Sequence, residues 1–164
     1  MRLLKPEKLS AAAFAPYGDV IEVSNAKEQR QINYGNTTRF HDLAELDLTN
    51  QQGKALVSIF RSTPLPRPIP IKVMEVHPLS SQAFVPLNDR PYLVVVAGKG
   101  EHFQPEDVRA FVAQPQQGVN YHRGCWHHYS LALEEVSDFL VIDRDGPGHN
   151  CTEVHLKEEI YIDY

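Results

Sequence analysis

Cysteine is scarce in this chain of 164 residues, with Cys125 and Cys151 as its two copies. They lack the Cys-x-x-Cys spacing of zinc and redox motifs, and two cysteines cannot build the disulfide framework of a small secreted domain. The first ten residues place charges inside a short apolar stretch, unlike the apolar core of a signal peptide. We therefore expect a cytoplasmic protein.

Long apolar runs and net positive charge are also missing. The longest apolar run, residues 93–97, falls far short of the roughly 18 residues that cross a bilayer. The formal net charge is -5, so the surface as a whole repels nucleic acid and anionic membranes. We expect no nucleic-acid or membrane partner, although the 16 Lys and Arg side chains leave room for a local cationic pocket.

Several catalytic signatures are absent as well. No Gly-x-Ser-x-Gly segment occurs, so Ser80 and Ser81 have no nucleophile elbow around them. The stretch Gly98-Lys99-Gly100 lacks the third glycine and the following helix of a dinucleotide-binding loop. The sequence thus gives no support to a serine hydrolase or a nucleotide-binding enzyme.

What the chain does contain is a composition of ordinary globular type, with 42% hydrophobic and 23% charged residues. A chain of this length buries enough surface to form a core without disulfides or metals. We expect one domain that spans residues 1–164.

Short segments rich in Val, Ile, Phe and Tyr recur between Pro, Gly and Asn residues, the pattern of an all-β sandwich or barrel. The prolines at positions 64, 66, 68 and 70 indicate an extended connector. The predicted strands are Asp19–Val23, Ala55–Arg61, Ile71–His77, Ser81–Pro86, Tyr92–Ala97, Arg109–Ala113, Gly118–Tyr121, His127–Leu133, Phe139–Asp143 and Glu159–Tyr164.

Helix is predicted at few places. Ser10 can cap a short helix over Ala11–Phe14, and Pro105 can begin a single turn. The segment His41–Leu48 fits neither pattern clearly. The expected fold class is therefore all-β with minor helix.

The first block of interest surrounds Glu75, His77 and Gln82. Side chains alternate faces along a strand, so Glu75 and His77 point the same way. Residues 78–81 form a plausible turn, after which Gln82 begins a returning strand. The hairpin gathers three residue types that ligate a divalent metal or transfer protons.

The second block runs from His122 to His128. His122 and His127 are an odd number of residues apart and would face opposite sides of one unbroken strand. Gly124 can supply a turn or bulge that brings both into one pocket. Without such a bulge, His122 and His128 share a face instead. Any one histidine alone is more often structural, so the prediction rests on the two blocks together.

Both blocks resemble the two signature segments of the cupin superfamily. Glu75, His77 and Gln82 fall where the first cupin motif carries its ligands, and the run from His122 to His127 overlays the second motif. Glu and Gln replace a His and an acidic ligand, which leaves a weaker metal site than the standard set. The resemblance implies a cupin-type antiparallel β-barrel, or jelly roll.

A closer resemblance is to the bacterial ureidoglycolate lyase family. It is carried along the whole chain by the stretches at residues 15–22, 39–43, 77–86, 118–128 and 138–144, of which Asn-Tyr-His-Arg followed by Trp-His-His is the most specific. It implies a homodimeric carbon–nitrogen lyase that converts (S)-ureidoglycolate to glyoxylate and urea in allantoin and purine breakdown. It also implies a divalent metal, nickel in particular.

Cleavage of this substrate needs a base for the hydroxyl proton, an acid for the departing nitrogen and a cationic clamp for the carboxylate. His77, His122, His127 and Glu75 are the catalytic candidates, because imidazoles titrate near working pH. His77, Gln82 and His127 are the metal candidates. For the clamp we favour Arg61, at a predicted strand end, over Arg39; Gln82 is a further substrate contact.

Three other functions stay open at this point. The first is a non-catalytic cupin that binds a small acid, and the second is an amidohydrolase that releases ammonia from ureidoglycolate. The third is an iron dioxygenase, which the absence of a full His-x-His plus carboxylate set disfavours.

Overall fold

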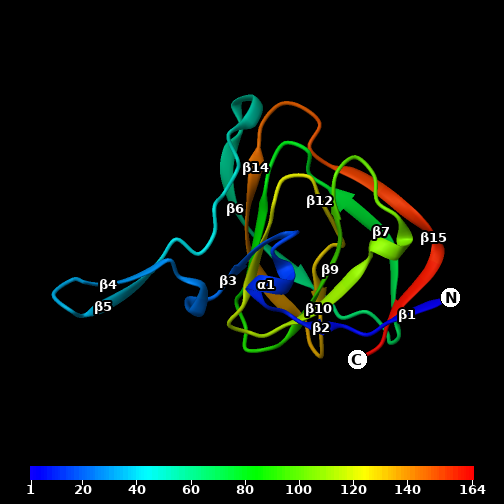
Figure 1. The fold of residues 1–164 in the computed structure, drawn as a ribbon, viewed down its shortest axis with the longest axis horizontal. Helices are drawn as coiled ribbons and strands as arrows, with labels where there is room; N and C mark the ends of the chain where they lie inside the picture. Colours follow the sequence, from blue (N-terminus) through cyan, green and yellow to red (C-terminus); the bar gives the residue numbers. More distant parts are fainter.

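The computed structural model describes residues 1–164 and shows two mainly antiparallel sheets, with parallel pairs only at the two edges of the larger one, that curl against each other as an open barrel (Figure 1). The all-β, cupin-type expectation is confirmed. The larger sheet has the order β1 (Arg2–Leu4), β15 (Thr152–Ile162), β7 (Ile69–Val76), β12 (Cys125–His127), β9 (Tyr92–Lys99), β10 (Arg109–Ala113) and β2 (Glu7–Lys8), with β13 (Leu131–Ala132) also beside β9.

The smaller sheet has five strands and ends in a free edge. Its order is β3 (Gly18–Ile21), β11 (Gly118–Tyr121), β8 (Gln82–Pro86), β14 (Ser137–Asp145) and β6 (Lys54–Ser62). Helix is confined to α1 (Ala11–Phe14), capped by Ser10 as expected, and three 3₁₀ turns, η1 (Val23–Asn25), η2 (Asn50–Gln52) and η3 (Pro105–Asp107). No helix has the length and apolar character needed to cross a membrane.

The core has two parts because β9 is buried on both faces. Tyr92, Val94 and Val96 face a cluster between the two sheets, which also holds Phe111 and Phe139. The alternate residues of β9, Leu93, Val95 and Ala97, face a second cluster. That cluster comes almost wholly from the larger sheet and includes Met74, Trp126 and Ile160. A strand buried on both faces explains the continuous apolar run in the sequence.

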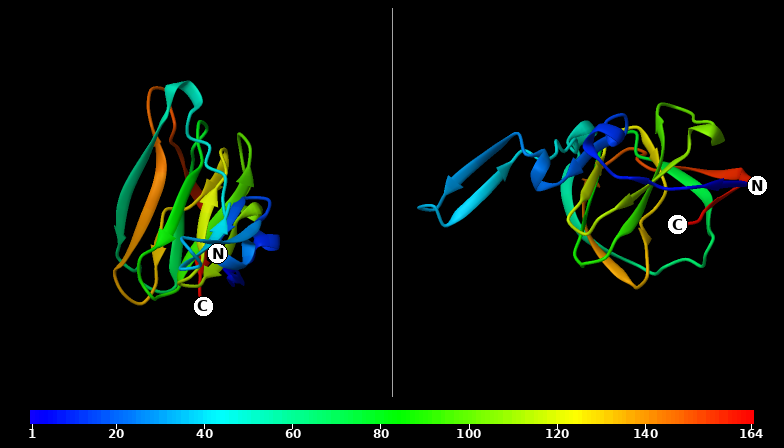
Figure 2. Two further views of the ribbon diagram at one scale, coloured as in Figure 1. Left: turned by 90° about the vertical axis from the view of Figure 1, so that its left-hand side faces the viewer. Right: turned by 60° about the horizontal axis from the view of Figure 1, so that its bottom comes forward.

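One segment stands away from the barrel. Strands β4 (Glu28–Ile32) and β5 (Thr37–His41) pair only with each other and form a projecting hairpin, called here the arm, residues 28–41 (Figures 1 and 2). The sequence did not predict these strands because neither has an apolar face to bury; every residue of β4 is exposed.

Two other differences from the predicted strands concern the C-terminal half. The strand predicted over His127–Leu133 is wrong, since it is broken into β12 and β13. The last strand starts at Thr152, seven residues before its predicted start, and slips register against β7 between His155 and Ile160. The slip lies beyond Glu75, which pairs regularly with Glu153.

Candidate active site

Four of the predicted residues converge between the two sheets and are called here the inner cluster: Glu75, His77, Gln82 and His127. Glu75 on β7 lies directly opposite His127 on β12. The ring centroids of His77 and His127 are 5.2 Å apart. One ligand atom from each of Glu75, His77 and His127 fits within 4.8 Å. Imidazoles from two distant stretches of chain therefore meet at one place, as the sequence predicts.

A turn and a bulge decide which way the second block faces. Tyr121 and Cys125 both point into the core between the sheets, and Gly124 adopts a left-handed φ of +78° in the turn that joins them. The pairing of β12 with β9 shifts between Trp126 and His127. His127 consequently faces inward beside Tyr121, and its ring stacks on the Tyr121 ring at 4.0 Å with an interplanar angle of 4°.

His77 is held by hydrogen bonds on both ring nitrogens. Its Nδ1 lies 2.7 Å from the backbone oxygen of Asn150, which can only accept, so this nitrogen carries a proton. Its Nε2 lies 3.0 Å from Oε1 of Gln82. If Nε2 carried no proton, its lone pair would face a lone pair of Gln82 Oε1. The contact is therefore favourable only when Nε2 carries a proton or when both atoms bind the same cation.

His127 is fully buried and has one nitrogen without a partner. Its Nδ1 lies 3.1 Å from the carbonyl oxygen of His128, while its Nε2 is buried and makes no hydrogen bond. Burial, and next the proximity of His77, lower the pKa of His127 to about 3. The ring is therefore neutral at working pH. Its Nδ1 lies 3.7 Å from Oε1 of Glu75.

The pKa of Glu75 is shifted in the opposite direction to that of His127. Burial raises the pKa of its carboxyl above the ordinary value, and nearby His77 opposes part of that rise. A carboxyl group of raised pKa next to an imidazole is suited to taking and returning a proton.

The inner cluster fits a divalent metal. The unpaired Nε2 of buried His127 is the arrangement expected of a metal ligand, and both histidines give their other nitrogen to a backbone carbonyl, as metal-bound histidines do. Two imidazoles and a carboxylate, with the amide oxygen of Gln82 beside them, form a mixed nitrogen and oxygen set that suits a divalent ion.

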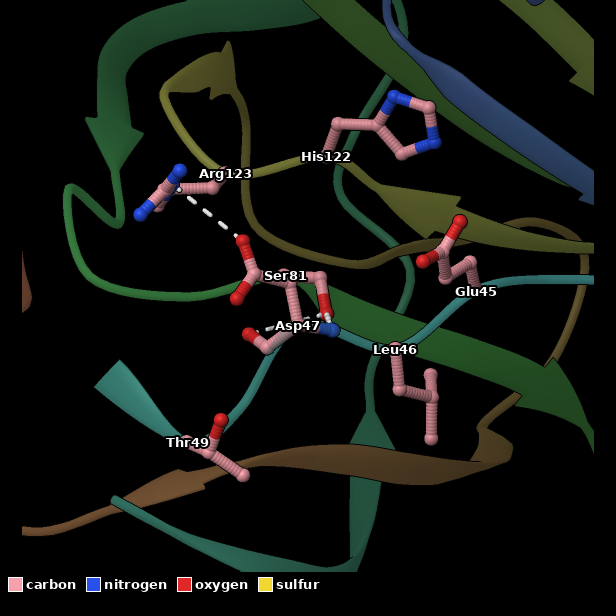
Figure 3. Close-up of a pocket in the computed structure, with 7 residues that line it drawn as sticks. All are labelled: Glu45, Leu46, Asp47, Thr49, Ser81, His122 and Arg123. Carbon is pink, nitrogen blue, oxygen red and sulfur yellow. Dashed lines mark hydrogen bonds and ion pairs between the residues drawn. The ribbon is translucent and has the colours of Figure 1, made fainter. Parts of the chain in front are cut away.

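His122 does not join the inner cluster. It follows Tyr121 and therefore points to the other face of the smaller sheet. There its Nε2 lies 3.1 Å from Asp19 Oδ2, and its Nδ1 lies 3.0 Å from Lys99 Nζ. It lines a separate polar pocket of about 380 Å³, where Figure 3 shows Arg123 directed at Asp47. Gly124 reverses the chain only after His122, which is why the turn does not bring this residue inward.

Neither of the two arginines predicted to bind the substrate carboxylate lies in the inner cluster. Arg61 forms a bidentate ion pair with Asp138, at 2.8 and 3.0 Å. Asp138 alternates with the buried Phe139, so this pair lies on the outside of the smaller sheet. Arg39 is exposed on the arm, opposite Arg30. The sequence placed Arg61 at a strand end but could not tell which face it takes.

Sequence reasoning missed three contributors to the site. Tyr121 stacks on His127, Asn150 accepts from His77, and Asp143 accepts a hydrogen bond of 3.1 Å from Nε2 of Gln82. Tyr121 and Asp143 lie within stretches that carried the family resemblance, which was the one available signal. Nothing in the sequence marks Asn150, which contacts His77 through its backbone oxygen and bonds Leu79 and Ser80 through its side chain.

The chain is similar over nearly its whole length to known proteins that share one name. A family model described as ureidoglycolate lyase matches residues 1–163. A protein named ureidoglycolate lyase from Burkholderia mallei (strain NCTC 10229) is 52% identical over 162 residues, which cover 99% of this chain and 94% of the relative. Proteins of the same name from Pseudomonas syringae pv. syringae (strain B728a) and Azotobacter vinelandii (strain DJ) are 51% and 50% identical, and cover 96% and 97% of this chain and 92% and 95% of their own lengths.

Proposed function

Because this chain belongs to the ureidoglycolate lyase family, we propose that it cleaves ureidoglycolate to glyoxylate and urea at the inner cluster. The chain is a lyase that acts on ureidoglycolate. The observation that supports the placement is the convergence of two imidazoles and a carboxyl of raised pKa between the sheets.

The reaction moves one proton from oxygen to nitrogen. One carbon of the substrate carries a hydroxyl, a carboxylate and a urea nitrogen. As the carbon–nitrogen bond breaks, the hydroxyl oxygen loses its proton and becomes the carbonyl oxygen of glyoxylate, while the departing nitrogen gains a proton. A single positioned group can therefore serve as base and then as acid, with no net change in its own state.

We assign this proton transfer to Glu75. Its raised pKa brings the carboxyl closer to working pH, so the ionised form accepts the hydroxyl proton and the protonated form returns it to nitrogen. His77 is kept in place by Asn150 and Gln82 and directs its Nε2 side toward the cluster. His127, neutral and rigidly stacked on Tyr121, orients rather than protonates.

Nickel or another divalent ion would be held by His77, Gln82 and His127, with Glu75 beside them. When bound, such an ion acidifies a hydroxyl group and supplies positive charge for a carboxylate. That charge is relevant because Arg61 and Arg39 do not reach the cluster of their own chain.

The products distinguish this function from its rivals. With purified protein and ureidoglycolate, we expect glyoxylate and urea to form in equal amounts, well above the uncatalysed rate, with no ammonia. Release of ammonia would indicate an amidohydrolase. Binding of glyoxylate in calorimetry without any turnover would indicate a non-catalytic small-acid-binding cupin.

We further propose that the enzyme is a homodimer whose interface includes the arm and the free edge of β6. An isolated two-stranded hairpin is only marginally stable in water, and the two strands of the arm pair only with each other. Tyr34 at the tip of the arm is fully exposed. The edge strand β6 exposes Leu56, Val57 and Ile59, and exposed apolar edges are normally covered. A second copy would cover both features and bring Arg39 of the arm to an interface.

The change Ile59→Lys is expected to weaken self-association about tenfold or more, because it places an unpaired charge in the interface. The matched control is Leu3→Lys, since Leu3 is similarly exposed but lies on β1, at the end of the molecule away from the arm (Figure 1). Light scattering after size exclusion, over a range of concentrations, measures the effect. A wild-type protein that stays monomeric at about 100 µM would rule out this dimer.

We also propose that the enzyme works in the cytoplasm in allantoin breakdown. Both cysteines are free thiols, Cys125 buried and Cys151 exposed, as is usual in a reducing compartment.

A further inference from the structure

The side chain of Gln82 is fixed by a carboxylate on the neighbouring strand. Gln82 begins β8, and Asp143 lies near the end of β14, which pairs with β8 at Ala83 and Ile142. Nε2 of Gln82 donates to Oδ2 of Asp143 at 3.1 Å, and Oε1 of Gln82 lies 3.0 Å from Nε2 of His77. Gln82 is buried, with 5% of its surface exposed.

An amide group alone can present either its oxygen or its nitrogen. A carboxylate accepts hydrogen bonds and cannot donate them, so Asp143 selects the rotamer in which the nitrogen of Gln82 faces away from the cluster. The amide oxygen then faces His77. Hydrogen bonding to a charged acceptor also polarises the amide and makes its oxygen a stronger donor of electrons.

The same contact accounts for glutamine at a position where the standard cupin pattern has a carboxylate. A glutamate at position 82 would lie within about 3 Å of Asp143, and two carboxylates at that distance repel. The negative charge therefore lies on Asp143, outside the inner cluster. It acts on the cluster through the hydrogen bond that Asp143 accepts from the amide group of Gln82.

We propose that Asp143 is a positioning residue that orients Gln82 in the inner cluster and that the two residues form an exchangeable pair of amide and carboxylate. This inference rests on the proposed function of the cluster. It assigns to Asp143 a role that depends on the residue at position 82, which is the property to test.

The test exchanges the two groups. Gln82→Glu alone is expected to lower Ni²⁺ affinity and kcat/KM by about 10–100-fold, the usual cost of disturbing a ligand's support. Asp143→Asn alone keeps an acceptor oxygen and is expected to cost less than about tenfold. The double variant Gln82→Glu with Asp143→Asn restores an amide that donates to a carboxylate, and we expect it to recover at least about tenfold over Gln82→Glu.

Ni²⁺ titration of the metal-free proteins by calorimetry gives a readout independent of turnover, and thermal unfolding of the same samples checks that each variant folds. Effects of the two changes that simply add would overturn the proposal, as would a Gln82→Glu variant with unchanged Ni²⁺ affinity. Failure of the proposed function has a different signature: the wild type would release no glyoxylate and urea above the uncatalysed rate, or His77→Ala would keep wild-type turnover because the inner cluster is not the site.

Discussion

Replacing His77 by alanine is expected to lower kcat/KM for ureidoglycolate by at least about 10–100-fold, because it removes a proposed metal ligand that lies beside the proton-transfer group Glu75. The ring faces Gln82 Oε1 through Nε2 and is anchored by Asn150 through Nδ1, so alanine removes a group from the centre of the inner cluster. The same change should weaken Ni²⁺ binding by at least about tenfold in calorimetry. Glyoxylate formation at several substrate concentrations measures the first effect.

His155→Ala is the matched control, because His155 is exposed on β15 and belongs to no part of the cluster. It should leave turnover and Ni²⁺ binding unchanged. His77 is half-buried, so its loss should change the melting temperature little. Loss of activity accompanied by an equal loss of folded protein would identify His77 as structural instead.

His127 is a poorer choice for this experiment. Its ring is 0% exposed and stacks on Tyr121, so alanine leaves a cavity in the core. Removing a buried aromatic ring costs about 3–5 kcal/mol, which would mix a loss of stability with any loss of activity.

The second prediction is that two buried histidines together remove about 4 kcal/mol of stability from the metal-free protein between pH 7 and pH 5. Burial lowers the pKa of His127 to about 3 and that of His128 to about 4, against an ordinary value of 6.5. Below pH 6.5 the unfolded chain binds a proton at each of these rings and the folded chain does not, so stability falls as pH falls. Each ring contributes about 2 kcal/mol by pH 5.

Glu75 acts with the opposite sign, because its folded-state pKa is raised and the folded chain keeps that proton longer as pH rises above 4.5. It offsets only part of the effect of two histidines. Urea unfolding in the presence of a chelator, at pH 7, 6 and 5, measures the change. The exposed-histidine variant His155→Ala should follow the wild type, and a stability that stays flat from pH 7 to pH 5 would contradict the burial of the two rings.

Much of the site was predictable because it depends on the period of a strand. Glu75 and His77 lie two residues apart and face one way in any strand, and a short turn returns the chain at Gln82. The family resemblance predicted the substrate and the type of bond that is cleaved. The fate of His122 was not predictable, because it depended on where the turn at Gly124 would begin; the chain reverses only after His122.

The sequence by itself determined the β class, the strands with a buried face, the first half of the inner cluster and the family. Tertiary structure alone decided that His127 enters the cluster while His122 leaves it, that Arg61 points outward to Asp138, and that Asp143 supports Gln82. The arm also emerged only in three dimensions. The reason is physical: alternation along one strand is local, whereas the register between strands and the direction after a bulge are set by packing between residues far apart in the chain.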